Sequence, residues 1–353
     1  MLTDGIILKS SLHFDQNRTC SAIFHLITGK KSIQTVQDAH IYQLKNLYGI
    51  NRSFHKREFD RRINTLVSNH LLELDESMSC SVTSSGKDWL KEQYHYLKLN
   101  DYDGLQYHTA APIFYDRLLL LIQTLSNSCN NHYSFIPVIE RTPILQWVKV
   151  AFKQLKLNKK SFSNQLQFDL HKLLKDFSDE EASIYVDRLS GFNHYGRSKD
   201  QLALDYQKDK LDISFIIERM NHAMLNKIYS DPHGFPAIGF LITDLRNKQF
   251  ITNSASKTYQ LLQENYSISE IGQMRRLKEN TVYDHVVEVA LFTHDFPVSN
   301  YVSEDQQQQI LLAVSKECTY KLKAIKQMVD LSISYFQIRL VLATMQHVGE
   351  HYE

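Results

Sequence analysis

The scarcity of glycine and proline is the feature of this sequence that most restricts its fold. Eleven glycines and six prolines make 17 of 353 residues, about 5%, whereas average proteins contain about 12% of the two together. Sandwiches, barrels and glycine-looped nucleotide folds need many more of these residues at their turns. The sequence therefore predicts a mainly α-helical protein, and its length indicates several domains.

The overall charge excludes a protein that attracts nucleic acid through its net field. Forty Lys and Arg oppose 39 Asp and Glu, which leaves a formal net charge of +1. Any nucleic-acid site must therefore come from a local excess of cations.

The cysteines and apolar runs predict a cytoplasmic protein with no membrane span. The cysteines are Cys20, Cys80, Cys129 and Cys318. They form no C-x-x-C pair, so we expect free, small core residues in a reducing compartment and no metal site. Asp4 stands where a signal peptide carries basic residues. The longest aliphatic run, residues 118–122, is too short to cross a bilayer.

The motifs of the common enzyme classes are missing from the sequence. No two glycines are separated by one residue, and neither G-x-S-x-G nor H-E-x-x-H occurs. Residues 28–32 resemble a phosphate loop, but Phe24 stands at the first glycine position and Lys31 at the Mg²⁺-binding hydroxyl position. We therefore expect a protein that is not an enzyme, with no cofactor and no small-molecule substrate.

Residues 1–108 are expected to form an N-terminal winged-helix-like domain. Apolar residues at helical spacing predict a helix over residues 54–69. Two strand-like runs, at residues 71–75 and 80–83, predict a small β-hairpin, and a Thr-x-x-Gly turn then begins another helix. The alternative is a helical domain with one hairpin.

Residues 109–245 are expected to form a central helical domain that includes a basic segment. Residues 149–175 contain seven lysines and one aspartate, a local charge of +6, with three phenylalanines interleaved. Such a pattern suits a phosphate backbone and exposed bases. The candidate contacts are Lys153, Lys156, Lys159 and Lys160. In the alternative, which is common for amphipathic helices, the phenylalanines pack inward and the lysines form a solvated face.

The same central domain contains a second pattern of helix, turn and helix. Ser178 and Glu181 form a capping box, Ser198 begins a short helix and Asp212 begins a longer one. This arrangement resembles the promoter-reading region of sigma factors at the level of pattern.

Residues 250–353 are expected to form a C-terminal helix-turn-helix domain. Ser267 and Glu270 form a capping box at the start of a short helix, and residues 275–278 form the turn to the next helix. The inner face of that helix is formed by Val282, Val286 and Val289. Its outer face is expected to present Asn280, Thr281, Tyr283, Asp284 and Val287 to a groove.

The candidate nucleic-acid contacts of this domain are the cations of the turn and four residues on the expected outer face of the helix that follows. They are Arg275, Arg276, Lys278, Asn280, Thr281, Tyr283 and Asp284. The local charge opposes tight binding, because residues 256–295 contain four cations and six carboxylates, a net −2.

Residues 267–286 resemble the helicase-type helix-turn-helix found at the C-terminus of some RecQ-type helicases and in the YpbB-like proteins of Firmicutes. Residues 321–326 and 334–343 are similar to the closing segment of that domain. The size and layout of the rest, including residues 28–34 and 37–40, resemble the YpbB-like proteins over their whole length. The resemblance implies a RecQ-type helicase as partner and a role in DNA repair or recombination.

Three functions are compatible with these patterns. The first is a nucleic-acid-binding accessory protein, with DNA or RNA as ligand. The second is an adaptor that docks on the helicase without tight DNA binding of its own. The third is a transcriptional regulator, which would lack an evident dimerisation helix or ligand pocket.

Because no phosphate loop, metal cluster or activated nucleophile is evident in the sequence, we predict that the pure protein hydrolyses neither ATP nor DNA. ATPase and nuclease assays are expected to stay at background. Hydrolysis that follows the protein through several chromatographic columns would contradict this prediction.

Overall fold

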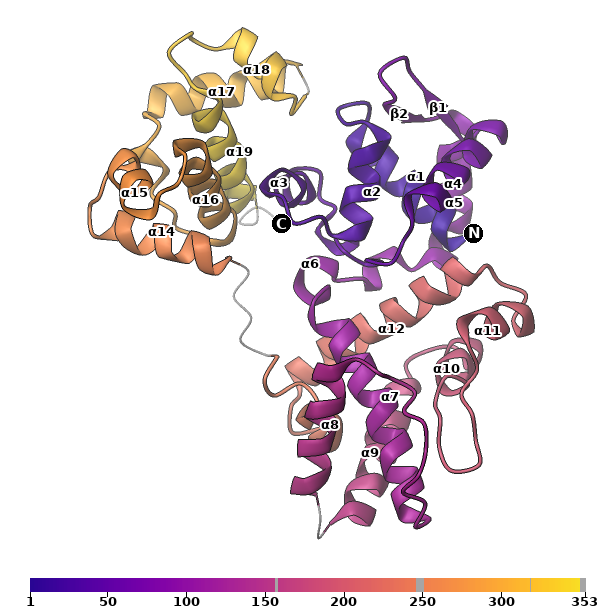
Figure 1. The fold of residues 1–353 in the computed structure, drawn as a ribbon. Helices are drawn as coiled ribbons and strands as arrows, with labels where there is room; N and C mark the ends of the chain where they lie inside the picture. The colour runs from indigo at the N-terminus through magenta and orange to yellow at the C-terminus, as the bar shows by residue number, and fades with distance from the viewer. Residues whose placement is uncertain (156–157, 246–250, 318, 350–353) are drawn as a thin grey trace.

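The computed structural model describes residues 1–353 except 156–157, 246–250, 318 and 350–353. It is mainly α-helical, with one two-stranded sheet in the described residues, as the sequence predicts (Figure 1). No helix in the described part of the chain is long and apolar enough to cross a membrane.

The first part of the chain has the predicted order of helix, hairpin and helix. Its elements are α1 (Leu2–Phe14), α2 (Cys20–Thr28), α3 (Ile33–Ile41), η1 (Lys45–Leu47), α4 (Lys56–Ser68), β1 (Leu72–Leu74), β2 (Cys80–Val82), α5 (Ser84–Leu97), η2 (Leu99–Asp101) and α6 (Gly104–Tyr107). The strands are antiparallel, with Leu74 opposite Cys80. Thr83 caps α5 by accepting a hydrogen bond from the Gly86 N–H at 3.0 Å.

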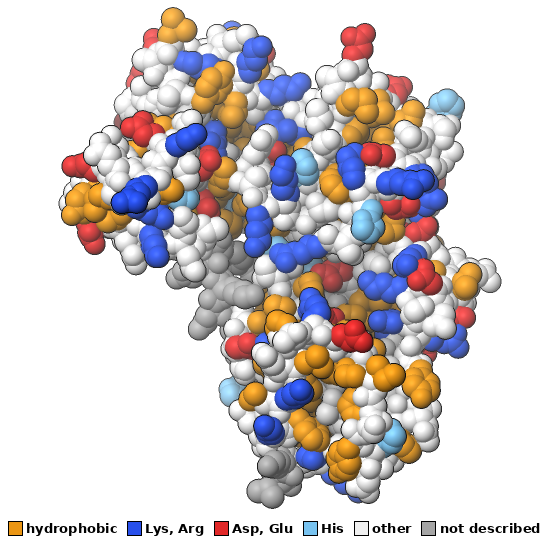
Figure 2. Space-filling model, viewed as in Figure 1, with side chains coloured by type: hydrophobic (Ala, Val, Ile, Leu, Met, Phe, Trp, Pro, Cys, Tyr) orange, Lys and Arg blue, Asp and Glu red, His pale blue; other side chains and the backbone are white. Residues whose placement is uncertain are grey.

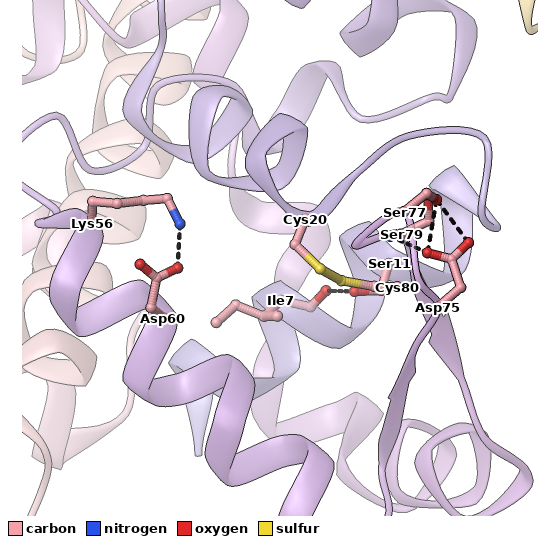
Figure 3. Close-up of a disulfide and its surroundings, with 9 residues drawn as sticks. All are labelled: Ile7, Ser11, Cys20, Lys56, Asp60, Asp75, Ser77, Ser79 and Cys80. Carbon is pink, nitrogen blue, oxygen red and sulfur yellow. Dashed lines mark hydrogen bonds and ion pairs between the residues drawn. A yellow bond between two sulfur atoms is a disulfide. The ribbon is translucent and has the colours of Figure 1, made fainter.

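A disulfide between Cys20 and Cys80 joins the start of α2 to the hairpin (Figure 3). Both side chains are buried, as predicted, but the expectation that they are free is wrong. The fold brings together two residues that are 60 positions apart, which spacing in the sequence cannot show. Cys129 is exposed, so its predicted place in the core is also wrong. Cys318 lies outside the described residues.

The middle of the chain packs around two long helices. Its elements are α7 (Ala110–Cys129), α8 (Thr142–Gln154), α9 (Lys159–Leu174), α10 (Asp179–Val186), α11 (Lys199–Asp205), α12 (Lys210–Ser230) and α13 (Pro236–Phe240). Helix α7 packs against α8, α9 and α12. The capping box of Ser178 and Glu181 is present at the start of α10, as predicted.

The predicted helix-turn-helix of this region exists as α11, a turn and α12, but α12 lies inside the molecule. It contacts α1, α7 and α10 and runs between the first and middle parts of the chain (Figure 1). Ile213, Phe215 and Met220 are fully buried. Because its apolar residues are covered on several sides, α12 has no free face to place in a nucleic-acid groove.

Polar side chains of α12 bind the elements around it. The Asp212 carboxylate accepts hydrogen bonds from the N–H groups of Leu2 and Thr3, at 3.1 and 2.8 Å, and so caps α1. Arg219 forms a buried ion pair with Glu181 of α10. Glu181 also accepts from Lys98, at 3.0 Å. Burial opposes ionisation of Glu181, but Arg219 and these hydrogen bonds outweigh it and lower its pKa to about 2.

The last part of the chain is built around α16. Its elements are α14 (Asn253–Gln263), α15 (Ile268–Arg275), α16 (Glu279–Phe292), η3 (Val298–Asn300), α17 (Glu304–Glu317), α18 (Leu322–Met328) and α19 (Tyr335–Gly349). Helix α16 packs against α14, α15 and α19, and both α16 and α19 contact α3 of the first part.

We predict that Glu181→Gln lowers the free energy of unfolding by about 3 kcal/mol at neutral pH, because it leaves the buried Arg219 with only the more distant carboxylate of Asp101, at 3.3 Å. The pKa of Glu181 is lower in the folded protein than the ordinary 4.5. This contribution is therefore complete above pH 4.5 and is lost as the pH falls through about 2, so the variant and the wild type should converge in acid. Urea unfolding at several pH values measures the difference.

The matched control is Glu180→Gln, because Glu180 is half-exposed and pairs with Lys208 at the surface. Its effect should be about 0.5 kcal/mol or less. Equal losses in the two variants would contradict a special role for the Glu181 pair.

Candidate nucleic-acid interface

The α15–α16 segment has the local geometry that the sequence predicts. The capping box of Ser267 and Glu270 begins α15, with the Ser267 N–H 2.8 Å from the Glu270 carboxylate. Gly272 is buried, and a Cβ there would lie 3.2 Å from the carbonyl oxygen of Leu277. Glycine thus allows the close approach of the turn to α15. Arg276 ends α15 in the left-handed conformation, with φ 53°.

The turn and the first residues of α16 form the exposed part of this segment, which we call the α16 tip. Its exposed side chains are those of Arg276, Lys278, Glu279 and Asn280. Neither Arg276 nor Lys278 has a hydrogen-bonding or ion-pairing side-chain partner among the described residues. Two unpaired cations beside a helix N-terminus attract a phosphate, although Glu279 opposes them.

Arg275, which we predicted to contact nucleic acid, is engaged inside the domain. Its guanidinium donates to the Ser254 carbonyl at 2.8 Å and to the Thr258 hydroxyl. Thr258 in turn lies 2.8 Å from Nδ1 of His285. Burial and the nearby Arg275 lower the pKa of His285. This network joins α14, α15 and α16, and the sequence contains no periodic signal that predicts it.

The expected outer face of α16 is covered by α19. The Tyr283 ring stacks on Phe336, with ring centres 4.3 Å apart, and Asp284 pairs with Arg339 at 2.7 Å. Val287 is fully buried, so its predicted place on the outer face is wrong. Thr281 is half-buried. The pattern of α16 alone cannot reveal this cover, because α19 begins more than forty residues later in the chain.

Helix α3 completes the cover. The Gln37 amide donates to the Arg339 carbonyl at 2.8 Å, and the Arg339 Nε donates to Gln37 at 3.3 Å. The ring of His40 packs edge-on against Phe292, with ring centres 5.2 Å apart. Of the seven candidate residues in this domain, the fold brings Arg276, Lys278 and Asn280 together at the α16 tip and holds the others wholly or partly in internal contacts.

The basic segment of the middle region lies on α8 and α9. Phe152 and Phe162 pack against the core, as the solvated-face alternative expects, whereas Phe168 is 62% exposed. Lys159 Nζ lies 4.0 Å from the centre of the Phe152 ring. Lys153 and Lys160 are exposed, and Lys156 lies outside the described residues.

Comparisons with known proteins agree with this geometry. A family described as a helix-turn-helix domain matches residues 254–342, which contain α15, the turn and α16. The chain is 30% identical over 349 residues to protein YpbB of Bacillus subtilis (strain 168), and the alignment covers 96% of each chain. No solved structure gives a significant match.

We predict that Arg339→Ala lowers the free energy of unfolding by about 1 kcal/mol, because it removes a partly exposed ion pair and the contact with Gln37. Asn280→Ala is the control and should change it by less than about 0.5 kcal/mol, since Asn280 is exposed. Urea unfolding of the full chain measures both. A large effect of Asn280→Ala alone would show that the register assigned to α16 is wrong.

Proposed function

This chain belongs to the YpbB-like family, and from that premise we propose that it is a non-enzymatic nucleic-acid-binding protein that assists a RecQ-type helicase in DNA repair or recombination. The main observation that supports this proposal is the helix-turn-helix domain, whose α16 tip presents unpaired cations at the surface. Helix-turn-helix domains commonly use the start of the second helix to contact DNA.

The exposed side chains of the α16 tip suit this role. Arg276 and Lys278 supply charge for phosphate oxygens, and the Asn280 amide has the donor and acceptor that pair with adenine. Since the following residues of α16 are covered by α19 and α3, few side chains of this helix reach base edges. We therefore expect contact that depends mainly on the backbone and varies little with sequence.

The proposed helicase partner rests on resemblance. Residues 267–286 resemble, in their sequence pattern, the domain at the C-terminus of some RecQ-type helicases. The comparisons themselves name a helix-turn-helix domain and protein YpbB. The absence of known catalytic motifs from the sequence supports a role in binding rather than in turnover.

A second candidate function is that of a protein adaptor on the helicase. The supporting observation is that α16 already serves as a protein-binding surface within the chain, through α3 and α19. The net charge of −2 over residues 256–295 also disfavours tight binding of DNA by this part of the protein.

One experiment separates the two candidates. It uses a triple variant of the α16 tip, with Arg276→Gln, Lys278→Gln and Asn280→Ala. This variant should bind a short DNA duplex about tenfold more weakly than the wild type. The log–log slope of its binding constant against salt concentration should be shallower by about 0.9 for each lost phosphate contact. Fluorescence anisotropy measures DNA binding, and a pull-down measures retention of the cognate RecQ-type helicase.

The matched control is Lys316→Gln with Lys323→Gln, two exposed lysines on α17 and α18 of the same part of the chain. It should bind DNA like the wild type. If the α16-tip variant keeps its DNA affinity but no longer retains the helicase, the adaptor function is correct and the first proposal is wrong.

A further inference from the structure

A group of basic side chains lies near the end of α2 and the starts of α3 and α4, and we call it the α2–α3 patch. It consists of His25, Lys30, Lys31, Arg52 and Lys56. Lys30 Nζ lies 3.5 Å from Nε2 of His25. Lys56 Nζ lies 5.1 Å from the ring centre of Phe59 and 5.7 Å from that of Phe24, which is the residue before His25.

The positive charges of this patch lower the pKa values of two histidines. The pKa of His25 is lowered by burial and then by Lys30 and Lys56. The pKa of His108 is lowered to about 4 by burial and then by Arg52, although two backbone carbonyls oppose the shift. Lys30 and Lys56 therefore lie close to His25, and Arg52 lies close to His108.

The patch has few negative charges to balance it. Lys56 pairs with Asp60 on α4 (Figure 3). Asp38 lies nearby on α3 but is held by Arg18, at 2.7 Å. Lys30, Lys31 and Arg52 form no ion pair within the described residues. Like charges held close together repel one another, and a bound anion relieves this repulsion.

The backbone beneath the patch is held by two glycines. Gly29 ends α2 with φ 64°, and Gly49 has φ 69°. A Cβ on Gly29 would lie 2.8 Å from the Cα of Gly49, so no side chain fits between the two segments. The Gly49 N–H donates to the Leu26 carbonyl at 2.7 Å. This close approach brings the Lys30–Lys31 turn and the segment before Arg52 together.

The turn over residues 28–32 is the segment whose sequence resembles a phosphate loop. It does not wrap around a ligand in the manner of such a loop, since the Ser32 hydroxyl caps α3 by accepting from the Thr35 N–H at 3.3 Å. Its two lysines instead point to an open surface, and Lys31 lines a cavity of about 550 Å³ between this turn and the start of α14. Glu288, which also lines the cavity, accepts from the Thr252 N–H.

The surface view shows how widely the cations extend. Lys and Arg side chains are visible along the junction between the first and last parts of the chain, with some carboxylates beside them (Figure 2). Duplex DNA carries one negative charge per about 1.7 Å of its axis, so it can meet several separated cations at once.

We propose that the α2–α3 patch binds the phosphate backbone of duplex DNA, as a contact separate from the α16 tip. The proposal rests on the proposed function, since it names a second surface that the nucleic acid occupies. Its cations come from two chain segments that approach closely at Gly29 and Gly49, and in the described part of the chain only Lys56 has a carboxylate partner. The contact is independent of base sequence, because lysine and arginine meet phosphates here rather than base edges.

The test uses the full chain with Lys30→Gln, Lys31→Gln and Arg52→Gln, three exposed residues whose replacement should leave folding intact. Binding to a mixed-sequence duplex, and to a single DNA strand and an RNA of the same sequence, is measured by anisotropy at several salt concentrations. We expect the log–log salt slope to become shallower by about 2 to 3, from about 0.9 per phosphate contact. Affinity at low salt should fall at least tenfold.

The control removes the same charge elsewhere, with Lys91→Gln, Arg141→Gln and Lys210→Gln. Each of these cations pairs with a carboxylate, Asp88, Asp116 and Asp200 respectively. This control should keep the wild-type slope. A melting curve checks folding, and if the triple variant unfolds, Lys30→Gln with Lys31→Gln replaces it, with an expected slope change of about 2.

The outcomes separate the two proposals. In one outcome the wild type binds duplex DNA, the patch variant keeps the wild-type salt slope and the α16-tip variant loses affinity. The proposal for the patch is then wrong, and the proposed function stands. If the patch variant loses only single-strand binding, duplex DNA is the wrong ligand. If the wild type binds neither DNA nor RNA, both proposals are overturned.

Discussion

The buried polar contacts of α12 hold the first and middle parts of this protein together. Asp212 binds the first N–H groups of α1, and Arg219 pairs both with Glu181 on α10 and with Asp101 in η2. Each of these side chains is buried, and removal of one partner leaves the other buried with weaker compensation of its charge. The apolar residues between them pack against α1, α7 and α10. Residues of both parts therefore share one core, although the sequence patterns suggest separate domains.

The last part of the chain contacts the first part through α3, and polar side chains contribute to this contact. Arg339 binds Asp284 on α16 and Gln37 on α3, and the ring of His40 packs on Phe292. This contact has a functional consequence, because it uses the flank of α16 that a helix-turn-helix places in a groove. The α16 tip stays exposed, and the α2–α3 patch belongs to the first part of the chain. Nucleic acid that reached both surfaces would span two parts of the chain.

The features that the sequence predicts well are local. The hairpin before α5, the capping boxes of α10 and α15 and the close approach at Gly272 depend on residues a few positions apart. The candidate site is predicted less well. Arg276, Lys278 and Asn280 are exposed as expected, whereas Arg275 binds α14 and Tyr283 stacks on Phe336. Whether the exposed three bind nucleic acid stays a prediction.

The sequence by itself determined the helical class, the single hairpin and the helix-turn-helix near the C-terminus, because these follow from glycine and proline content, periodicity and capping residues. Only the tertiary structure decided which helix faces stay open. An apolar stripe in the sequence shows that a helix face is buried, but it does not show which segment covers that face. The half-polar face of Tyr283 and Asp284 is covered by α19, whose Phe336 and Arg339 complement it. The pairing of Cys20 with Cys80 and the joining of two basic segments at Gly29 and Gly49 are likewise contacts between distant residues, which no local pattern encodes.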